Sequence, residues 1–468
     1  MRLQDIIKGT DAKILYGTPE TEIDAIVSDS RKAAAGAAFF AVKGHDRDGH
    51  DYIDAARAAG ASAIVSASRR DLALCAANFY GHPSEKLSLV GITGTNGKTT
   101  TGTLLYNLFM GLGYNCGLLS TIANYVGRNR SETENTTADP ITINRLLKEM
   151  NDQGCEYCFM EVSSIGVEQE RVAGLKYKVG IFSNLTHDHL DYHGTFAEYL
   201  RCKKLFFDSL PKDAYALINI DDRNGMVMVQ NTAAKVVTYS CRNMADHTCR
   251  ILEESFEGML LKIDETETWT RLIGQHNAYN VLAIYSAARC LGAGKEETLL
   301  ALSKLESAPG RLENLRGPRD ISVVIDYAHT PDAMENVLKT LREIAPKKQL
   351  VCLFGCGGDR DRTKRPEMAK VAEAFADRII VTSDNSRTER TEDILEDIRK
   401  GFGGEGLRKA IFIADRREAI RTAIITANDG ATILLAGKGH ETYQIIGTEH
   451  RHFDEREVVA EVFKTMLN

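Results

Sequence analysis

The segment 93–100, which reads Thr-Gly-Thr-Asn-Gly-Lys-Thr-Thr, constrains the fold of this chain more than any other feature. It follows an apolar stretch at 87–92, typical of a buried strand, and precedes a helical pattern at 101–112. At such a turn, glycines let backbone N–H groups surround phosphate oxygens, a lysine adds positive charge, and the next hydroxyl binds Mg²⁺. The longer form of this motif has glycine where this chain has Ile92. We therefore predict a shortened phosphate-binding loop for a nucleoside triphosphate, made of Gly94, Thr95, Asn96, Gly97, Lys98, Thr99 and Thr100.

Composition bounds the class of protein. The chain has 468 residues, 43% of them hydrophobic and 26% charged, so we expect two to four domains with sizeable cores. The formal net charge is −7 and no basic block is present, which argues against nucleic acid and anionic membrane surfaces as partners. No apolar run reaches the roughly 18 residues of a membrane span, and the start lacks the apolar core of a signal peptide. We expect a cytoplasmic protein without membrane insertion.

The ten cysteines are scattered along the chain and are expected to be reduced thiols. Cys155 and Cys158 form one C-x-x-C, but no second pair follows at zinc-finger spacing. We interpret them as two buried thiols rather than as a zinc site.

The C-terminal third alternates between helix-like segments and apolar strands, which we place at 323–325, 350–354, 379–382, 410–413 and 433–436. This order predicts a parallel, doubly wound sheet. Ligands bind at the carboxyl ends of the strands in such sheets, and polar residues follow each predicted strand. They are Asp326, His329, Asp359, Arg360, Asp384, Arg387, Asp415, Lys438 and His440.

Upstream, the first 86 residues hold shorter segments, with strands expected at 37–42 and 63–65 and a helix at 52–60. A linker is expected at 81–84. After the phosphate loop, further strands are expected at 157–162, 178–183 and 214–220. Both regions therefore read as α/β structure.

A metal site is indicated by two segments. Glu161 lies at the end of a predicted strand and would direct a carboxylate toward the phosphate loop. Residues 187–193 contain three histidines and two aspartates, which do not easily share a core. A site is therefore favoured over packing.

These residues make the chain resemble the Mur ligases, ATP-dependent enzymes that form amide bonds in peptidoglycan synthesis. Residues 184–191 are similar to the family's metal motif, and 193–203 resembles the segment with its carbamylated lysine. A carbamate formed from CO₂ is an anion that binds Mg²⁺, whereas a free ammonium with a pKa of about 10.4 repels it. From the residues alone, Lys203 and Lys204 would read as solvated helix charges. The resemblance implies catalytic roles for Lys98, Glu161, His189 and Lys203, with two Mg²⁺ held by Thr99, Glu161, His189 and carbamylated Lys203.

The resemblance also implies further ATP contacts. Residues 274–280 resemble the family's adenine-contacting helix start, and Asn amides suit an adenine edge. The segment 326–332, Asp-Tyr-Ala-His-Thr-Pro-Asp, resembles the branch that adds the third residue of the peptide stem. The additional ATP-binding residues are His276, Asn277, Asn280, Arg311, Asp326 and His329.

The segment 384–387, Asp-Asn-Ser-Arg, bears on which amino acid is added. The branch that adds meso-diaminopimelate has Asp-Asn-Pro-Arg, whose arginine pairs bidentately with a substrate carboxylate, while the L-lysine branch lacks it. Arg387 therefore favours meso-diaminopimelate. L-lysine or another amino acid stays as the alternative, because Ser386 replaces the proline and its fixed φ. The implied amino-acid contacts are Arg360, Asp384, Asn385, Ser386, Arg387, Gly437 and Glu441.

A second departure is Ile165, where the family has histidine. It supports another alternative, a catalytically weakened nucleotide-binding regulator of the family. A mechanochemical P-loop ATPase would need a second basic transmission element, which we do not find in the sequence.

The family's second substrate, besides ATP, carries a UDP group. By resemblance to the family's N-terminal and middle domains, we assign the residues that would contact this substrate. A positive charge at Arg171 would offset phosphate or carboxylate. The implied contacts are Ser28, Ser30, Asn135, Thr136, Thr137, Ser163, Gln169 and Arg171.

The implied reaction adds meso-diaminopimelate to UDP-N-acetylmuramoyl-L-alanyl-D-glutamate through an acyl phosphate made from ATP. We expect a small N-terminal α/β domain at 1–88 for the UDP substrate and a central P-loop ATPase domain with a mostly parallel sheet at 89–308. A Rossmann-like, doubly wound domain at 309–468 would bind the amino acid. The expected partners are small-molecule substrates only, and the expected oligomeric state is a monomer.

Overall fold

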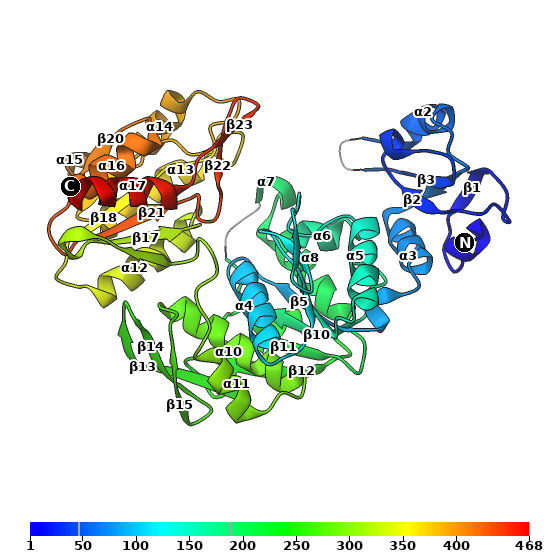
Figure 1. Cartoon of the computed structure of the whole chain (residues 1–468), viewed down its shortest axis with the longest axis horizontal. Helices are drawn as coiled ribbons and strands as arrows, with labels where there is room; N and C mark the ends of the chain where they lie inside the picture. Colours follow the sequence, from blue (N-terminus) through cyan, green and yellow to red (C-terminus); the bar gives the residue numbers. More distant parts are fainter. Residues whose placement is uncertain (45–46, 187–189, 468) are drawn as a thin grey trace. The chain divides into compact units, whose positions relative to one another are not determined.

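The structure is a computed structural model that describes residues 1–44, 47–186 and 190–467. Two compact units are present, and each is described by itself (Figure 1). The first consists of Met1–Leu185, His193–His247 and Ala283–Ala301, and the second of Thr186–Tyr192, Thr248–Leu282 and Leu302–Asn468.

The start of the first unit is a four-stranded sheet with the order β1-β4-β3-β2. Side chains of β3 alternate between its two faces, as the period of a strand requires. Ala38 and Phe40 pack with helices α1 and α3, whereas Phe39 and Ala41 pack with α2. The elements are α1 (Leu3–Ile6), β1 (Lys13–Tyr16), β2 (Ala25–Val27), β3 (Ala37–Val42), α2 (Ile53–Ala58), β4 (Ala63–Ala67) and α3 (Arg69–Phe79).

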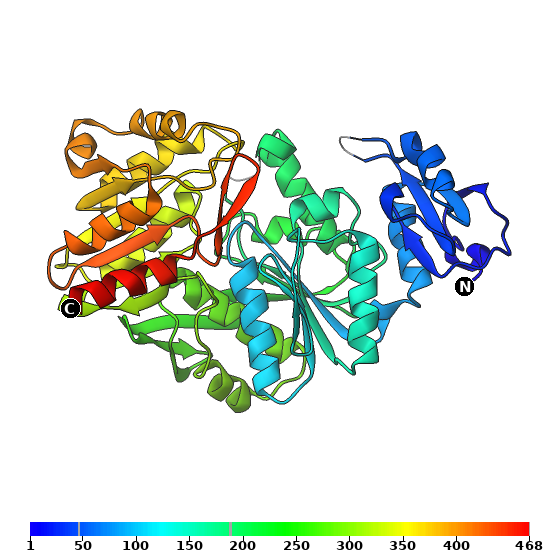
Figure 2. The same cartoon turned by 45° about the horizontal axis from the view of Figure 1, so that its top comes forward.

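The rest of the first unit is built on strands in the order β12-β11-β10-β5-β9-β6-β7-β8. Strands β12 to β6 in this order are parallel, so their carboxyl ends share one edge, and β5 lies between β10 and β9. Figure 2 shows α4 and α5 running beside these strands. The strands are β5 (Ser88–Thr93), β6 (Cys116–Leu119), β7 (Asn124–Val126), β8 (Asn129–Ser131), β9 (Tyr157–Glu161), β10 (Tyr177–Phe182), β11 (Tyr215–Asn219) and β12 (Lys235–Ser240). The helices are α4 (Lys98–Gly111), α5 (Pro140–Asp152), α6 (Ser164–Glu168), α7 (Leu190–His193), α8 (Phe196–Asp208), α9 (Gly225–Met228) and α11 (Lys295–Leu302).

The second unit contains a six-stranded sheet with the order β16-β17-β21-β18-β19-β20, parallel except for β16. Alternate side chains of each strand enter two separate cores. Leu434 packs with α12, α13 and α14 on one face, and Leu435 packs with α16 and α17 on the other. The strands are β16 (Glu313–Arg316), β17 (Ser322–Asp326), β18 (Leu350–Phe354), β19 (Arg378–Val381), β20 (Ala410–Phe412) and β21 (Thr432–Ala436). The helices are α12 (Pro331–Ile344), α13 (Lys364–Phe375), α14 (Thr391–Arg399), α15 (Gly404–Lys409), α16 (Arg416–Ile425) and α17 (Glu455–Leu467).

The predicted strands are all present, each within two residues of its expected ends, and the C-terminal sheet is doubly wound as predicted. The helix after the phosphate loop begins at Lys98, three residues before the predicted start, because Gly97 at φ +87° ends the turn there. Helix α10 (Gln275–Cys290) was not predicted, and only its start was assigned, as a motif. Strands β6, β7 and β8, whose successive pairs are antiparallel, were not predicted either. Nor were the meander β13 (His247–Ser255), β14 (Gly258–Ile263) and β15 (Thr266–Thr270) and the hairpin β22 (Tyr443–Ile446) and β23 (Glu449–His452).

We expect the Leu435→Ala variant to lose about 2–5 kcal/mol of unfolding free energy in the second unit, since a cavity would remain in a closed core. Leu435 is fully buried in β21. The Ile411→Ala variant, whose side chain on edge strand β20 is 38% exposed, is the control. Denaturant unfolding followed by circular dichroism measures both losses, and equal losses would contradict the assignment of Leu435 to the core.

Candidate active site

The phosphate loop connects the end of β5 to the start of α4. Gly94 has φ +149° and Gly97 has φ +87°, so two glycines form the turn with positive φ. The Lys98 ammonium folds back over the loop, where Nζ donates to the carbonyl oxygens of Gly94 at 2.9 Å and Thr95 at 2.8 Å. The lysine therefore lies against the loop that is expected to surround the phosphates of ATP.

The loop is held from the side by residues that follow β10. Asn184 accepts from the Asn96 backbone N–H through Oδ1 at 2.9 Å, and Ser183 Oγ donates to the Asn96 carbonyl at 2.6 Å. The Asn184 carbonyl also accepts from the Thr95 N–H at 2.9 Å. Asn184, the first residue of the predicted metal motif, thus shapes the phosphate loop.

Glu161 ends β9 beside the loop, and its side chain is fully buried. Its carboxylate accepts from Thr99 Oγ1 at 3.1 Å and from the N–H and hydroxyl of Thr121 at 2.8 and 3.1 Å. A hydroxyl and a carboxylate side by side next to a phosphate loop are the oxygen ligands that Mg²⁺ takes in such sites. Thr121 was missed because β6, the strand before it, was not predicted.

Lys203 is 1% exposed and lies within α8, with Nζ donating to the Gly94 carbonyl at 2.9 Å and lying 4.7 Å from the centre of the Tyr199 ring. The Tyr199 hydroxyl in turn shares a 3.0 Å hydrogen bond with Thr95. The interpretation of Lys203 as a solvated helix charge is therefore wrong. Its neighbour Lys204 pairs with Asp208 at 2.7 Å instead.

His189, together with His187 and Asp188, lies outside the described residues. His193 is buried, and its Nε2 is 2.9 Å from Ser164 Oγ. In the described part of the chain, no group of three or more His, Cys, Asp or Glu residues could hold a metal ion. The residues described here fit Mg²⁺ bound by a few protein oxygens together with substrate phosphates, which is the usual way that proteins bind this ion.

Several predicted contacts of the UDP substrate cluster around the same strand end. Thr137 Oγ1 donates to the Glu161 carbonyl and to Ser163 Oγ, both at 3.0 Å. Arg171 donates to the Thr137 carbonyl at 2.7 Å and to Gln169 Oε1 at 2.7 Å. Two more of the predicted contacts are near: Thr136 accepts from Thr121, and the Asn135 carbonyl accepts from Thr133.

The remaining two predicted contacts, Ser28 and Ser30, flank Asp29 after β2. The Asp29 carboxylate accepts from the Arg31 N–H at 3.0 Å, which starts a short 3₁₀ turn at Ser30. Hydrogen bonds from the Arg31 side chain and backbone lower the pKa of Asp29 to about 2.

In the second unit, His276 and Arg311 lie near each other. Burial and the Arg311 charge lower the pKa of His276 to about 4, so the imidazole is neutral at physiological pH. The Arg311 guanidinium lies 4.8 Å from the centre of the Tyr327 ring, and its buried Nε has no hydrogen-bond partner among the described residues. A buried donor without a partner is a position that a ligand or a water molecule can fill.

The other predicted ATP residues support local structure. Asn277 Nδ2 donates to the Ile273 carbonyl at 2.8 Å, and Asn280 donates to Asn277 at 2.9 Å. Asp326 accepts from the backbone N–H groups of residues 312 and 328, and burial raises its pKa. His329 is exposed, with Nδ1 2.9 Å from the Tyr327 carbonyl.

The predicted amino-acid residues that follow β19 and β21 meet through Lys438, which is completely buried. Its Nζ donates to Glu441 at 2.9 Å and to Asn385 at 3.2 Å, and it lies 3.8 Å from Asp384. Asn385 also donates to Glu441 at 2.9 Å. Lys438 was noted only as a polar residue after a strand, and the structure adds it to this cluster.

Arg387 has the left-handed backbone conformation, with φ +49°, which is uncommon outside glycine. Its Nη1 donates to the Gly358 carbonyl at 2.9 Å, which joins this segment to the one that carries Arg360. Arg360 is exposed, and Ser386 is buried. Asp415 is not part of this cluster, because its carboxylate caps the start of α16.

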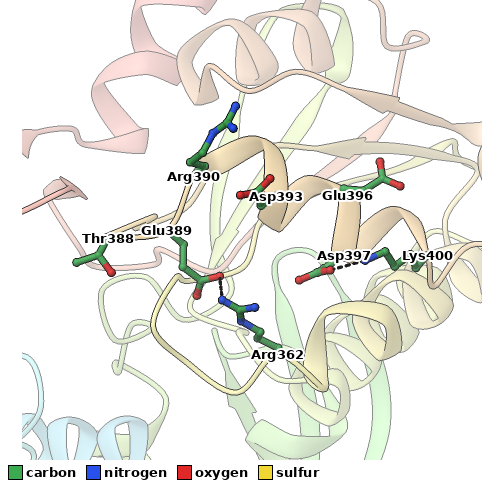
Figure 3. A pocket seen from close by; sticks show the side chains of 8 residues that line it. All are labelled: Arg362, Thr388, Glu389, Arg390, Asp393, Glu396, Asp397 and Lys400. Atoms are coloured by element: carbon green, nitrogen blue, oxygen red, sulfur yellow. Dashed lines mark hydrogen bonds and ion pairs between the residues drawn. The ribbon is translucent and has the colours of Figure 1, made fainter.

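A separate hollow nearby is lined by Thr388 and seven charged residues, four of which form two ion pairs (Figure 3). Arg362 pairs with Glu389 at 2.9 Å and Lys400 with Asp397 at 2.8 Å. Because these charges already offset each other, we assign the hollow no ligand.

Comparison with known protein families identifies the family to which this chain belongs. Three Mur ligase profiles match consecutive parts of the chain: the Mur ligase family catalytic domain at 22–87, the middle domain at 92–288 and the glutamate ligase domain at 310–439. The chain belongs to the Mur ligase family and is an ATP-dependent, amide-forming ligase. The predicted class, α/β with three domains, is confirmed, whereas the exact boundaries at 88 and 308 stay predictions.

Individual members of this family that are similar to the chain share one name. The chain is 49% identical to the UDP-N-acetylmuramoyl-L-alanyl-D-glutamate--2,6-diaminopimelate ligase of Phocaeicola vulgatus, over 99% of both chains. It is 42% identical to the ligase of the same name from Geobacillus kaustophilus, over 96% of both chains. A solved structure with that name matches with a TM-score of 0.71 and 32% identity, covering 100% of this chain and 99% of the other.

We expect the Gly94→Ala variant to bind ATP about tenfold or more weakly, because backbone strain of about 1–3 kcal/mol would distort the loop. A Cβ at position 94 would lie 1.9 Å from Ser183 Oγ. Gly111→Ala, at the other end of α4 with no atom within 4 Å of the added Cβ, is the matched control. Titration with a fluorescent ATP analogue measures both, and equal affinities would contradict the assigned loop.

Proposed function

We propose that this ligase adds meso-diaminopimelate to UDP-N-acetylmuramoyl-L-alanyl-D-glutamate in the synthesis of peptidoglycan precursors. The proposal is carried by the segment after β19, in which Asn385 accepts from Lys438 at 3.2 Å through its side chain and from Arg387 at 3.5 Å through its carbonyl. The names of the full-length relatives agree with it.

The first step transfers the γ-phosphoryl group of ATP to the D-glutamate γ-carboxylate, giving an acyl phosphate. Lys98 offsets the negative charge of the transferred group, as a lysine of a phosphate loop does. Two Mg²⁺ held by Thr99, Glu161, His189 and Lys203 as its carbamate would supply further charge neutralisation. His276, Asn277, Asn280, Arg311, Asp326 and His329 are proposed to contact ATP. Residues 28, 30, 135–137, 163, 169 and 171 are proposed to contact the UDP substrate.

In the second step the amine of diaminopimelate attacks the acyl carbon, the new C–N bond forms and phosphate leaves. The charges of the Lys438 cluster suit a substrate with an ammonium group. Asp384 and Glu441 carry two negative charges against the one positive charge of Lys438, which leaves one carboxylate to bind an ammonium. Arg387 and the exposed Arg360 are available for the carboxylate that diaminopimelate has and L-lysine lacks at that end.

We further propose that the protein works in the cytoplasm as a monomer, on small molecules alone. In the described residues, no helix is long and apolar enough to cross a membrane. Each proposed substrate carries phosphate or carboxylate groups, which the local cations Lys98, Arg171, Arg311, Arg360 and Arg387 would bind although the chain is acidic overall.

The Arg387→Lys variant is expected to raise the KM for meso-diaminopimelate by about tenfold or more, because lysine cannot form a bidentate pair with a carboxylate. Release of ADP in the presence of both other substrates measures it. Arg390→Lys, three residues along and 75% exposed at its side chain, is the control and should behave as wild type. Turnover of wild-type protein with L-lysine and not with diaminopimelate would overturn the proposed substrate.

The Lys203→Ala variant is expected to lose about a hundredfold or more in kcat with formate or acetate restoring part of it, since a small carboxylate can occupy the place of the carbamate. Lys204→Ala is the matched control, because its side chain pairs with Asp208 on the same helix. Wild-type activity in Lys203→Ala, or equal losses in both variants, would refute the carbamate.

A further inference from the structure

Arg416 and Glu455 form an ion pair that is completely buried in the second unit, and neither has been assigned a role above. Arg416 is the first residue of α16, and Glu455 is the first residue of α17. The pair has Nε to Oε1 at 2.9 Å, and both side chains have 0% exposure. Burying two charges has a desolvation cost that often exceeds their attraction. The pair is therefore a weak source of stability, and its other contacts indicate what it does.

The remaining donors of Arg416 reach two backbone carbonyls. Nη1 donates to the Ser383 carbonyl at 3.0 Å and Nη2 to the Ala436 carbonyl at 2.9 Å. Asp384 and Gly437, which directly follow these carbonyls, are the first residues of the two segments that form the amino-acid cluster. Since β18 lies between β19 and β21, no backbone ladder joins the two strand ends. The rigid, planar guanidinium spans this gap.

Lys438 makes a second connection between the same two segments, through Asn385 and Glu441. The segments also approach closely, because a Cβ at Gly437 would lie 2.8 Å from Asp384 Oδ2. Arg416 fixes where the two segments leave the sheet, and Lys438 fixes the side chains that they carry.

We propose that Arg416, held by Glu455, is a positioning residue that sets the separation of segments 384–387 and 437–441. This separation sets the distance between Glu441 on one segment, for the substrate ammonium, and Arg387 on the other, for the substrate carboxylate. Arg416 would thereby set the affinity of the site for the diamino acid. The inference rests on the proposed function, because it uses the same amino-acid site.

The chain offers a matched control at the opposite edge of the same sheet. Arg342 also donates to two backbone carbonyls, those of Lys348 at 3.2 Å and Phe375 at 2.9 Å, and to the Asp377 carboxylate at 2.9 Å. These carbonyls precede β18 and β19, far along the strands from the proposed site. Arg342→Gln therefore removes a similar two-carbonyl contact, from a side chain that is 29% exposed, without touching the amino-acid segments.

The test compares KM and kcat of wild type, Arg416→Gln, Glu455→Gln and Arg342→Gln in full-length protein, with thermal unfolding of each. Arg416→Gln is expected to raise the KM for diaminopimelate by about tenfold or more, since small misplacements of substrate contacts have large effects, with the KM for ATP within about twofold of wild type. Glu455→Gln keeps an oxygen that accepts from Arg416 and is expected to give a smaller rise in the same constant. Arg342→Gln is expected to lower the unfolding temperature and leave that constant unchanged.

If Arg416→Gln does not fold, Glu455→Gln against Arg342→Gln decides the question. An unchanged KM for the amino acid in Arg416→Gln, or in Glu455→Gln when Arg416→Gln does not fold, would overturn the inference. An equal rise in Arg342→Gln would do the same. Failure of the proposed function is seen separately, as wild-type protein that releases no ADP with diaminopimelate; the same comparison is then made with the amino acid that does support ADP release.

Discussion

The buried carboxylate of Glu161 is the interaction on which the first unit depends. This carboxylate accepts hydrogen bonds from Thr99 at the start of α4 and from Thr121 after β6. The backbone carbonyl of Glu161 accepts a further hydrogen bond from Thr137. One strand end therefore connects the phosphate loop with the segment proposed to bind the UDP substrate. In the proposed function, the ATP phosphate and the substrate carboxylate meet at this strand end.

In the second unit, buried polar side chains also connect separate segments of the chain. Its cluster of Asp384, Asn385, Lys438 and Glu441 gathers residues from two strand ends that are not neighbours in the sheet. Buried cations join the segments where backbone ladders cannot. In the proposed function, the two carboxylates of this cluster bind the ammonium of the amino acid.

The parts of the fold and of the candidate site that depend on local sequence patterns could be predicted from the sequence. The phosphate loop and the parallel strands follow from glycine placement and apolar runs, so the positions of Lys98, Thr99 and Glu161 at the loop could be predicted, while their roles stay predictions. Lys203 was not predictable from local pattern, because Lys203 and Lys204 look alike in sequence and only packing on α8 buries the first. Thr121 was missed because β6, the strand before it, was not predicted. Arg416 was missed because the carbonyls that it contacts belong to strand ends that only the order of the sheet brings together.

In the proposed reaction, ATP bound at the phosphate loop phosphorylates the D-glutamate γ-carboxylate. Substrate labelled with ¹⁸O in the D-glutamate γ-carboxylate tests this directly, with mass spectrometry of the phosphate released during turnover. Formation of an acyl phosphate predicts that one ¹⁸O atom moves from the carboxylate to inorganic phosphate for each amide bond made. Amide formation with unlabelled phosphate would rule out an acyl phosphate intermediate.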